Sequence, residues 1–285
     1  MNGPNIILIA DSGSTKTDWA WLENGQEAGS FRTEGYNPYF ADTPFIVASV
    51  APNIPASCSR ERVTEVNFYG SGCFDERVPI VASAMKELFP NATPFVKLDL
   101  LGSARALLGN EPGFAAILGT GTNTCLYDGV DITMNIDSLG YLLGDEGSGT
   151  HLGKKLLADL IREKLPADTR DALLAQYPID KEIIFEQIYS KPFPNRYCAA
   201  FTPFMLERMQ QGDDYVRDLV KGSFRELFQN LVSQYPGYKG LRFNCVGSIG
   251  HYFREPLLEV AADFGMPAGT IIKTPIEGLV KYHSN

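Results

Sequence analysis

The sequence predicts an α/β protein built from two duplicated domains, with the functional site in the cleft between them. Two observations support this prediction. Residues 8–26, LIADSGSTKTDWAWLENGQ, and residues 115–131, AAILGTGTNTCLYDGVD, share one pattern: an apolar run, a turn of glycine and hydroxyl residues, and a second run. Strands and helices then alternate after each copy, as in α/β domains. A shift of 108 residues superposes Ser-Gly-Ser at 12–14 on Thr-Gly-Thr at 120–122.

The first half is predicted to begin with three antiparallel strands. An isoleucine-rich run at 5–11, an alternating run and a third run follow one another, and the pair Asn24-Gly25 marks a two-residue hairpin turn. The later elements are a strand at 63–71, a helix at 75–89, a strand at 95–100 and a short helix at 102–109.

The second half repeats this order. A helix is predicted at 146–164, with Asp145 and Glu146 at its start, where the backbone dipole favours negative charge. Residues 165–240 are expected to be mainly helical, with breaks at KPFPNRY and QYPGYKG. The other predicted elements are strands at 114–119, 124–128 and 130–137, a strand and turn at 241–250, a helix at 252–264, a strand at 269–274 and a helix at 275–284.

The predicted domain boundary lies near residue 105. Residues 1–105 form the first domain, and residues 106–274 form the second, with a helical insertion at about 165–240. The closing helix, 275–285, is expected to pack on the first domain. Because ligand sites favour domain interfaces, the cleft between the domains is expected to carry the site.

The composition favours a small ligand. With 285 residues, 44% hydrophobic, the chain can bury a full core, and its net charge of −9 argues against nucleic acid or an anionic membrane as partner. The apolar run IILIA is too short for a signal peptide or a membrane span, so we expect a cytoplasmic protein. The five cysteines form no metal-binding pattern and are expected to be buried thiols: Cys58, Cys73, Cys125, Cys198 and Cys245.

The two turns of glycine and hydroxyl residues are candidates for gripping a polyphosphate. Glycine lets the backbone approach a ligand, while neighbouring amides and hydroxyls converge on an anion. Two ordinary β-turns remain the alternative, since these residues are common in turns. Neither a Walker loop nor a dinucleotide fingerprint fits the glycine spacing. The candidate residues are Ser12, Gly13, Ser14, Thr15 and Thr17 in the first turn, and Thr120, Gly121, Thr122 and Thr124 in the second.

Asp11 stands just before the first turn. A carboxylate there suits Mg²⁺ bound through its own waters, and the alternative is a turn aspartate that accepts backbone N–H bonds. Lys16 either contacts a phosphate or projects into solvent.

Four motifs in order, DSGSTKTDW, ILGTGTNT, GYLLGDEGSG and CVGSIG, resemble the N-acetylglucosamine kinase and BadF/BadG-type ATPase family of actin-like ATPases. The resemblance implies two ribonuclease H-like domains that bind ATP between them. It makes the first two motifs the phosphate turns, and it implies that Gly247, Ser248 and Gly250 line the adenosine pocket.

This family holds two kinds of activity. The activators of acyl-CoA dehydratases need cysteine ligands for a [4Fe–4S] cluster, and no suitable cysteine pair is present. The sugar kinases need a carboxylate at the end of a first-domain strand, where this chain has Asp99. The resemblance implies that Asp99 is the catalytic base, whereas by itself it would be read as a capping residue of the helix at 102–109.

The resemblance also places hexose contacts, at Asn37, Asp99, Thr120, Asn123 and Asp145. Leu139 stands where the family has a tryptophan near the N-acetyl group, which leaves open the choice among N-acetylglucosamine, glucosamine, N-acetylmannosamine and muramic acid derivatives.

The sequence therefore favours an Mg²⁺- and ATP-dependent kinase acting on the 6-hydroxyl of N-acetylglucosamine or a related amino sugar. The alternatives are an ATPase that switches a partner protein and, more weakly, a sugar sensor without catalysis. The expected partners are ATP and an amino sugar, with a homodimer implied by the resemblance and with no nucleic acid or membrane partner.

Overall fold

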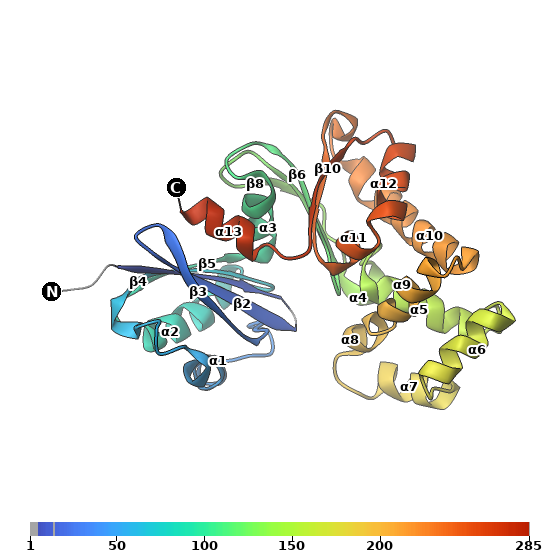
Figure 1. Ribbon diagram of the computed structural model, residues 1–285, viewed down its shortest axis with the longest axis horizontal. Coiled ribbons are helices and arrows are strands. Elements are labelled where there is room, and N and C mark those ends of the chain that lie inside the picture. The colour runs from blue at the N-terminus through green and yellow to red at the C-terminus, as the bar shows by residue number, and fades with distance from the viewer. Residues whose placement is uncertain (1–4, 14, 285) are drawn as a thin grey trace. The chain divides into compact units, whose positions relative to one another are not determined.

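The computed structural model describes residues 5–13 and 15–284, which divide into two compact units (Figure 1). Unit 1 runs to Pro112 and adds Tyr127–Ile132 and the segment from Thr274 on; unit 2 comprises Gly113–Leu126 and Thr133–Lys273. Residue 105 lies within a helix of unit 1. Each unit contains one five-stranded sheet with helices, so the predicted duplicated α/β architecture is confirmed.

The sheet of unit 1 has the order β3-β2-β1-β4-β5. Strands β1, β2 and β3 are antiparallel neighbours, as predicted, and β4 and β5 run parallel to β1. Asn24 and Gly25 both have positive φ, 53° and 74°, as a type I′ hairpin turn requires. The strands are β1 (Ile6–Ser12), β2 (Lys16–Glu23), β3 (Gln26–Glu34), β4 (Val63–Gly70) and β5 (Thr93–Leu98).

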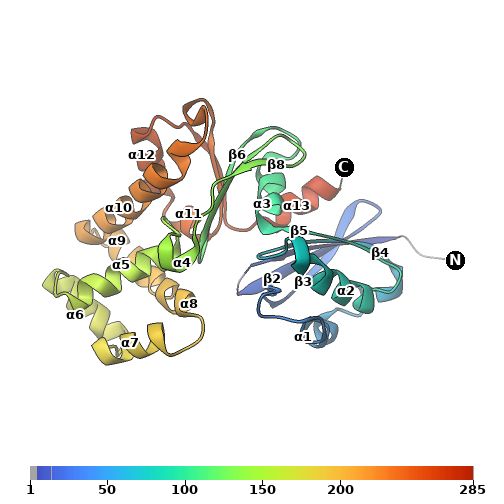
Figure 2. The same ribbon diagram turned by 180° about the vertical axis from the view of Figure 1, so that it is seen from behind.

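Helices cover both faces of this sheet (Figures 1 and 2). Leu8 and Ala10 of β1 share a buried cluster with residues of α1 and α2, whereas Ile9 packs with residues of α3 and α13. Alternate side chains of a strand point to opposite faces, so a fully apolar strand needs cover on both. The helices are α1 (Thr43–Val50), α2 (Val78–Leu88), α3 (Asp99–Leu108) and α13 (Ile276–His283).

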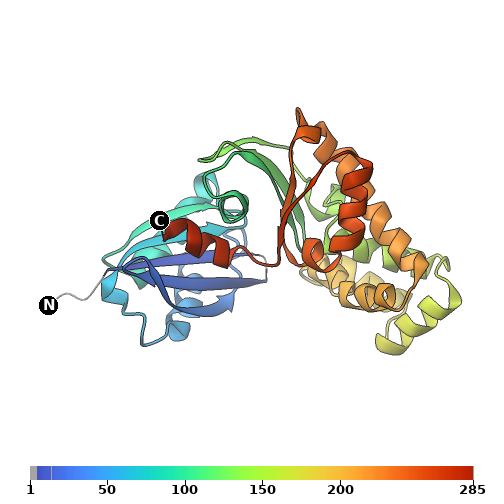
Figure 3. The ribbon, with the colours of Figure 1, turned by 45° about the horizontal axis from the view of Figure 1, so that its top comes forward.

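The sheet of unit 2 has the order β10-β9-β6-β7-β8, with β9 parallel to both β6 and β10. Alternate residues of β6, such as Phe114 and Leu118, belong to one core with α5, α10 and α12. Figure 3 shows α10 and α12 side by side on this face. The strands are β6 (Gly113–Leu118), β7 (Thr122–Tyr127), β8 (Ile132–Asn135), β9 (Phe243–Val246) and β10 (Ala268–Ile272).

Unit 2 differs from the prediction before its first long helix. Helix α5 begins at Gly149, capped by Ser148, whose Oγ accepts the amide of His151. Asp145 and Glu146 therefore precede the helix, and Asp145 has a left-handed φ of 59°. The remaining helices are α4 (Gly140–Leu143), α5 (Gly149–Ile161), α6 (Ala167–Gln176), α7 (Lys181–Tyr189), α8 (Pro194–Ala199), α9 (Thr202–Gln210), α10 (Asp214–Asn230), α11 (Ser248–Tyr252) and α12 (Arg254–Asp263).

Within the described residues, none of the helices combines the length and the apolar character needed to cross a lipid bilayer.

Helix α13 packs closely against α3. A Cβ added at Gly278 would lie 2.5 Å from the carbonyl oxygen and 2.8 Å from the Cα of Ala106. The contact is with backbone, which cannot move aside as a flexible side chain can. At the C-terminal end of α13, the hydroxyl of Tyr69 lies 2.9 Å from Nε2 of His283 and accepts a hydrogen bond from Arg105.

We expect Gly278→Ala to lower the free energy of unfolding by about 1–3 kcal/mol, because the helices must separate to admit the methyl group. The matched control is Gly222→Ala on α10, where a Cβ meets nothing within 4 Å. There the exchange is expected to raise stability by about 0.5–1 kcal/mol, since alanine favours helix. Urea unfolding of both variants measures the difference, and equal effects would contradict the close packing.

Candidate functional site

The parallel strands of unit 1 bring two carboxylates to one sheet edge. Asp11 lies near the carboxyl end of β1, paired in register with Tyr69 of β4, and Asp99 directly follows β5, whose Leu98 pairs with Gly70 of β4. Carboxyl ends of neighbouring parallel strands meet at a common edge, where α/β folds bind ligands. The two carboxylates interact electrostatically, so the predicted metal residue and the predicted base are neighbours.

Both carboxyl groups resist ionisation. Burial, followed by the negative charges of Asp99 and Asp18, raises the pKa of Asp11 to about 8. Burial raises the pKa of Asp99 to about 6, although its Oδ1 accepts the amide of Leu100 at 2.9 Å, which lowers it. Asp99 is also the first residue of α3, so it combines the position of a helix N-terminal acid with a pKa close to that of an effective general base.

The side chains of the first turn mostly bond within the protein. The hydroxyls of Ser12 and Thr17 lie 2.8 Å apart, and both residues are buried. Ser12 accepts the amide of Tyr36 at 3.0 Å, and Gly13 donates its amide to the carbonyl of Lys16 at 3.0 Å. Thr15 is exposed, and Ser14 lies outside the described residues. The Thr17 hydroxyl donates to the carbonyl of Glu34, and its contact with phosphate stays a prediction.

Lys16 forms an ion pair within unit 1. Its Nζ pairs with Oδ2 of Asp18, two residues along β2, while Arg32 of β3 pairs with Oδ1 of the same carboxylate at 2.6 Å. The lysine side chain is 42% exposed, so it is accessible but already paired.

Asn37 lies against the loop that follows β4. Its Oδ1 accepts the amide of Tyr39 at 2.9 Å, and a Cβ at Gly72 would lie 2.6 Å from the same oxygen. Gly72, with φ of 76°, is two residues beyond the end of β4. Asn37 is therefore near the sheet edge that carries Asp11 and Asp99.

In unit 2 the second turn is attached to the start of α5. Gly149 donates its amide to the carbonyl of Gly119 at 2.8 Å, and the amide and hydroxyl of Thr150 donate to the carbonyl of Thr120 at 3.1 and 2.6 Å. Residues 119 and 120 are thus fixed by the helix N-terminus. The sequence did not indicate that Gly149 and Thr150 hold the second turn, because these hydrogen bonds join residues 30 positions apart.

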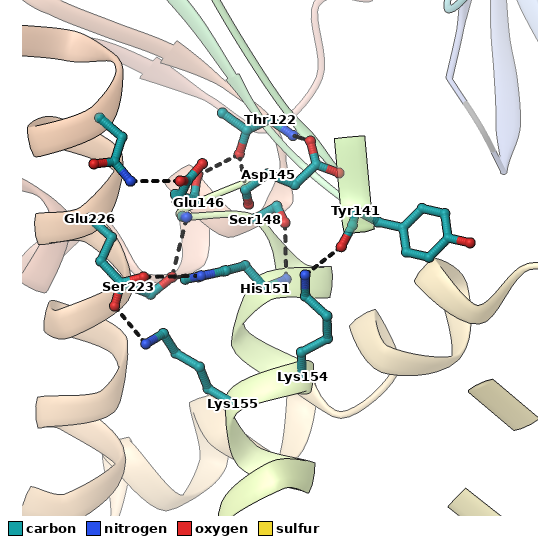
Figure 4. A network of polar contacts seen from close by, with 12 residues as sticks. Thr122, Tyr141, Asp145, Glu146, Ser148, His151, Lys154, Lys155, Ser223 and Glu226 are labelled. Carbon is teal, nitrogen blue, oxygen red and sulfur yellow. Dashed lines mark hydrogen bonds and ion pairs between the residues drawn. The ribbon is translucent and has the colours of Figure 1, made fainter. Parts of the chain in front are cut away.

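Asp145 completes this part of unit 2. Its Oδ1 accepts the amide of Thr122 at 3.1 Å, and a Cβ at Gly121 would lie 3.1 Å from its Oδ2. The Thr122 hydroxyl donates to the carbonyl of Glu146 at 2.7 Å (Figure 4). Burial raises the pKa of Asp145, and the Thr122 amide opposes this shift. The structure brings Gly121, Thr122 and Asp145 together, with Thr120 in the same turn.

Asn123 and Thr124 form hydrogen bonds within unit 2. The Oδ1 of Asn123 accepts the amide of Thr124 at 3.0 Å and the side-chain amide of Asn135 in β8 at 2.9 Å. Thr124 is fully buried, and its hydroxyl lies 2.9 Å from that of Tyr235. The contact of Thr124 with phosphate stays a prediction.

The predicted adenosine turn lies at the same edge of this sheet. Gly247 has φ of 127°, and a Cβ there would lie 2.2 Å from the carbonyl oxygen of Leu118, at the end of β6. A Cβ added at Gly250 would lie 2.4 Å from Sγ of Cys245. Ser248 is exposed and begins the short helix α11, so this segment is a helix start where the sequence suggested a turn.

A separate groove of about 440 Å³ in unit 2 lies among α4, α5, α7 and α8. It includes none of the predicted site residues. Its lining is mainly apolar and consists of Tyr141, Leu142, Lys154, Leu157, Ala158, Ile161, Arg162, Ile184, Phe185, Ile188, Tyr189, Pro194 and Cys198.

All five cysteines are buried and unpaired, as predicted. Within residues 5–13 and 15–284, no group of three or more histidine, cysteine or acidic side chains is arranged to hold a metal ion. A metal at Asp11 would therefore need other ligands, such as water or phosphate.

Comparison with solved structures identifies the family. A candidate N-acetylglucosamine kinase from Porphyromonas gingivalis is 38% identical, covers 98% of this chain and 99% of its own, and superposes with a TM-score of 0.92. The chain belongs to the N-acetylglucosamine kinase and BadF/BadG-type ATPase family. The resemblance read from the four motifs is confirmed.

Two more distant members of the comparison share the fold. A candidate N-acetylglucosamine kinase from Chromobacterium violaceum is 15% identical, with 98% and 99% of the two chains covered and a TM-score of 0.72. A ROK family glucokinase from Streptomyces griseus, solved with glucose and AMPPNP, is 13% identical, with 98% of each chain covered and a TM-score of 0.58. No protein-family model matches the chain.

The raised pKa of Asp11 predicts a dependence of stability on pH. Its folded pKa of about 8 exceeds the ordinary value of 3.8, so wild-type stability is lost progressively as pH rises from 4 to 8. Asp11→Asn removes this loss. Without divalent cations, its stability relative to wild type should increase by about 1–3 kcal/mol from pH 5 to pH 7.5, measured by urea unfolding. A difference that does not change with pH would contradict the burial of this charge.

Proposed function

We propose that this protein is an ATP-dependent sugar kinase that transfers the γ-phosphoryl group to the 6-hydroxyl of N-acetylglucosamine or a related amino sugar. The observation that carries the proposal is Asp99, a partly buried carboxyl group with a pKa of about 6 that lies beside Asp11 and near Asn37 at the ligand-binding edge of its sheet.

Asp99 acts as the general base in this proposal. The sugar hydroxyl oxygen forms a bond to the γ-phosphorus, the bond between that phosphorus and the β–γ bridging oxygen breaks, and the hydroxyl proton passes to Asp99. Phosphoryl transfer depends mainly on positioning and charge neutralisation, so one carboxylate suffices to accept the proton. Asn37 contributes a planar amide that pairs with sugar hydroxyls.

Asp11 fits a role in binding Mg²⁺ through water. Burial and then the neighbouring carboxylates Asp99 and Asp18 raise its pKa, and a divalent cation would offset the repulsion between these groups. The ion would neutralise charge on the phosphate oxygens. Unit 1 supplies the first phosphate turn, with Ser12, Gly13, Ser14, Thr15 and Lys16. To reach phosphate, Lys16 would have to exchange its pairing with Asp18.

Unit 2 supplies the second phosphate turn, Gly121 and Thr122, and the adenosine segment, Gly247, Ser248 and Gly250. Thr120, Asn123 and Asp145 hydrogen-bond the sugar. The similarity to the candidate N-acetylglucosamine kinase from Porphyromonas gingivalis supports a sugar kinase, and the glucokinase with bound glucose and AMPPNP is consistent with this at the level of the fold.

Replacing Asp99 by Asn is expected to lower kcat by about 10²–10⁴-fold and to leave ATP affinity nearly unchanged. In the wild type, kcat should fall as pH drops below about 6, since Asp99 then carries a proton. Steady-state kinetics and nucleotide titration measure both effects. Asp42→Asn is the matched control, because asparagine also caps α1. Wild-type turnover by the Asp99 variant would refute its role.

The substrate class is tested by ATP consumption in the presence of N-acetylglucosamine, glucosamine, N-acetylmannosamine and muramic acid derivatives. We expect consumption to depend on one of these sugars and to yield its 6-phosphate in equal amount. Leu139, 58% exposed, stands where the family has a tryptophan, so N-acetylglucosamine need not be the best of them. Hydrolysis indifferent to every sugar would instead favour an ATPase that switches a partner protein.

A further inference from the structure

The loop from Asp145 to Ser148 has a strained conformation. Asp145 is a non-glycine residue with φ of 59°, a region that costs about 1 kcal/mol or more for an L-residue. Gly147 has φ of 79°, and a Cβ there would lie 3.0 Å from Cδ2 of Leu227 on α10. Asp145, Gly147 and Ser148 are all buried. Such a loop keeps its shape only if surrounding contacts hold it.

Contacts from α10 hold this loop on one side. Asn230 donates its side-chain amide to Oε1 of Glu146 at 2.7 Å, and Ser223 accepts the amide of Gly147 at 3.2 Å. Ser223 is fully buried, so this hydroxyl is screened from water. The Gly147 amide therefore depends on the orientation of one serine side chain.

That serine is held in turn by His151 of α5 (Figure 4). Its Oγ lies 2.7 Å from Nδ1 of His151, whose Nε2 lies 3.2 Å from Oε2 of Glu226 on α10. Lys155 donates to the other carboxylate oxygen, Oε1, at 2.6 Å. The groups form a continuous chain from the Gly147 amide to the Lys155 ammonium.

With neutral His151, one assignment of hydrogens satisfies every member of this chain. The Gly147 amide donates to Ser223, the Ser223 hydroxyl donates to Nδ1, and Nε2–H donates to Glu226. A second ring proton would sit on Nδ1, point at the serine oxygen and force its hydroxyl hydrogen away. Protonation of His151 therefore leaves the hydroxyl hydrogen of buried Ser223 without its acceptor, which favours a shift of the serine side chain that also holds the Gly147 amide.

The charges around His151 come from both helices and from the loop. Burial lowers the pKa of His151, Lys155 and Lys154 on α5 lower it further, and Glu226 on α10 and Glu146 in the loop raise it. The net direction is downward, so the ring is neutral at pH 7. Lys154 is also bonded to the carbonyl of Tyr141 in α4.

We propose that His151, with Ser223 and Glu226, forms a positioning relay that fixes the Asp145–Ser148 loop and thereby sets the affinity for the acceptor sugar. None of the three touches the sugar; they act through Asp145. The effect on sugar affinity rests on the proposed function, whereas the effect on the loop does not. Above the pKa of His151 the relay is intact, and as pH falls through it the loop loosens.

The test compares two replacements of His151. Alanine removes the partner of Ser223, whereas asparagine keeps an acceptor near the place of Nδ1 and cannot titrate. We expect His151→Ala to raise the sugar KM about tenfold, because one buried hydrogen bond is lost, and to change kcat less than about threefold. His151→Asn should stay within about threefold of wild type. Lowering the pH should raise the sugar KM of wild type by a larger factor than that of the asparagine variant, in which only site carboxyl groups such as Asp99 and Asp145 still titrate.

A second readout needs no substrate. Hydrogen–deuterium exchange of peptides spanning 145–148 should be about tenfold faster in His151→Ala and Ser223→Ala than in wild type. Ser233→Ala and Glu186→Gln are matched controls, since Ser233 is half-buried with an exposed hydrogen bond to Gln229 and Glu186 forms an exposed pair with Lys191. Both controls should exchange as wild type does.

Unchanged exchange in His151→Ala would overturn the relay, as would a pH dependence of the sugar KM that is as large in His151→Asn as in wild type. If wild type phosphorylates no sugar, the proposed function fails, and the exchange experiment still decides whether His151 holds the loop.

Discussion

The crowding of Asp11 and Asp99 at one sheet edge is the interaction on which the account of this protein depends. Parallel strands force their carboxyl ends together, so residues 88 positions apart in the chain become electrostatic neighbours. Partly buried carboxyl groups that repel each other are unfavourable unless a cation, a proton or a ligand relieves them. A stable sheet covered by helices on both faces tolerates this cost. Burial at this edge gives Asp99 a pKa of about 6, which suits proton transfer near neutral pH.

The second unit repeats the topology and uses it differently. Its corresponding turn is bonded to the N-terminus of α5, so several of its polar groups serve to fix the backbone. Asp145 holds this turn from a strained loop, and the strain is supported by α10. The two units thus share one strand topology. Unit 1 carries the paired acids Asp11 and Asp99, and unit 2 carries a loop whose conformation depends on His151 and Ser223.

Much of the fold could be predicted from the sequence because its signals are local. The pair Asn24-Gly25 fixed the first hairpin, and the apolar runs marked the central strands. The predicted start of α5 was wrong, because acidic residues just before a helix cannot be distinguished by sequence from acidic residues in its first turn. Ser148 provides the cap. The internal hydrogen bonds of Thr17 and Thr124 could not be predicted, because hydroxyl residues at a turn can equally face the interior. The role of His151 could not be predicted from the sequence, since its partner Ser223 lies on another helix, 72 residues away.

The most direct test of the central claim is a titration of the aspartate carboxyl carbons by ¹³C NMR in the absence of divalent cations. The account predicts that Asp99 and Asp11 titrate as a coupled pair, with apparent pKa values of about 6 and about 8. It also predicts that the pKa of Asp11 falls when Asp99 is replaced by Asn. If both groups titrate near 4 and neither responds to the other, the two carboxylates are not crowded, and the account is contradicted.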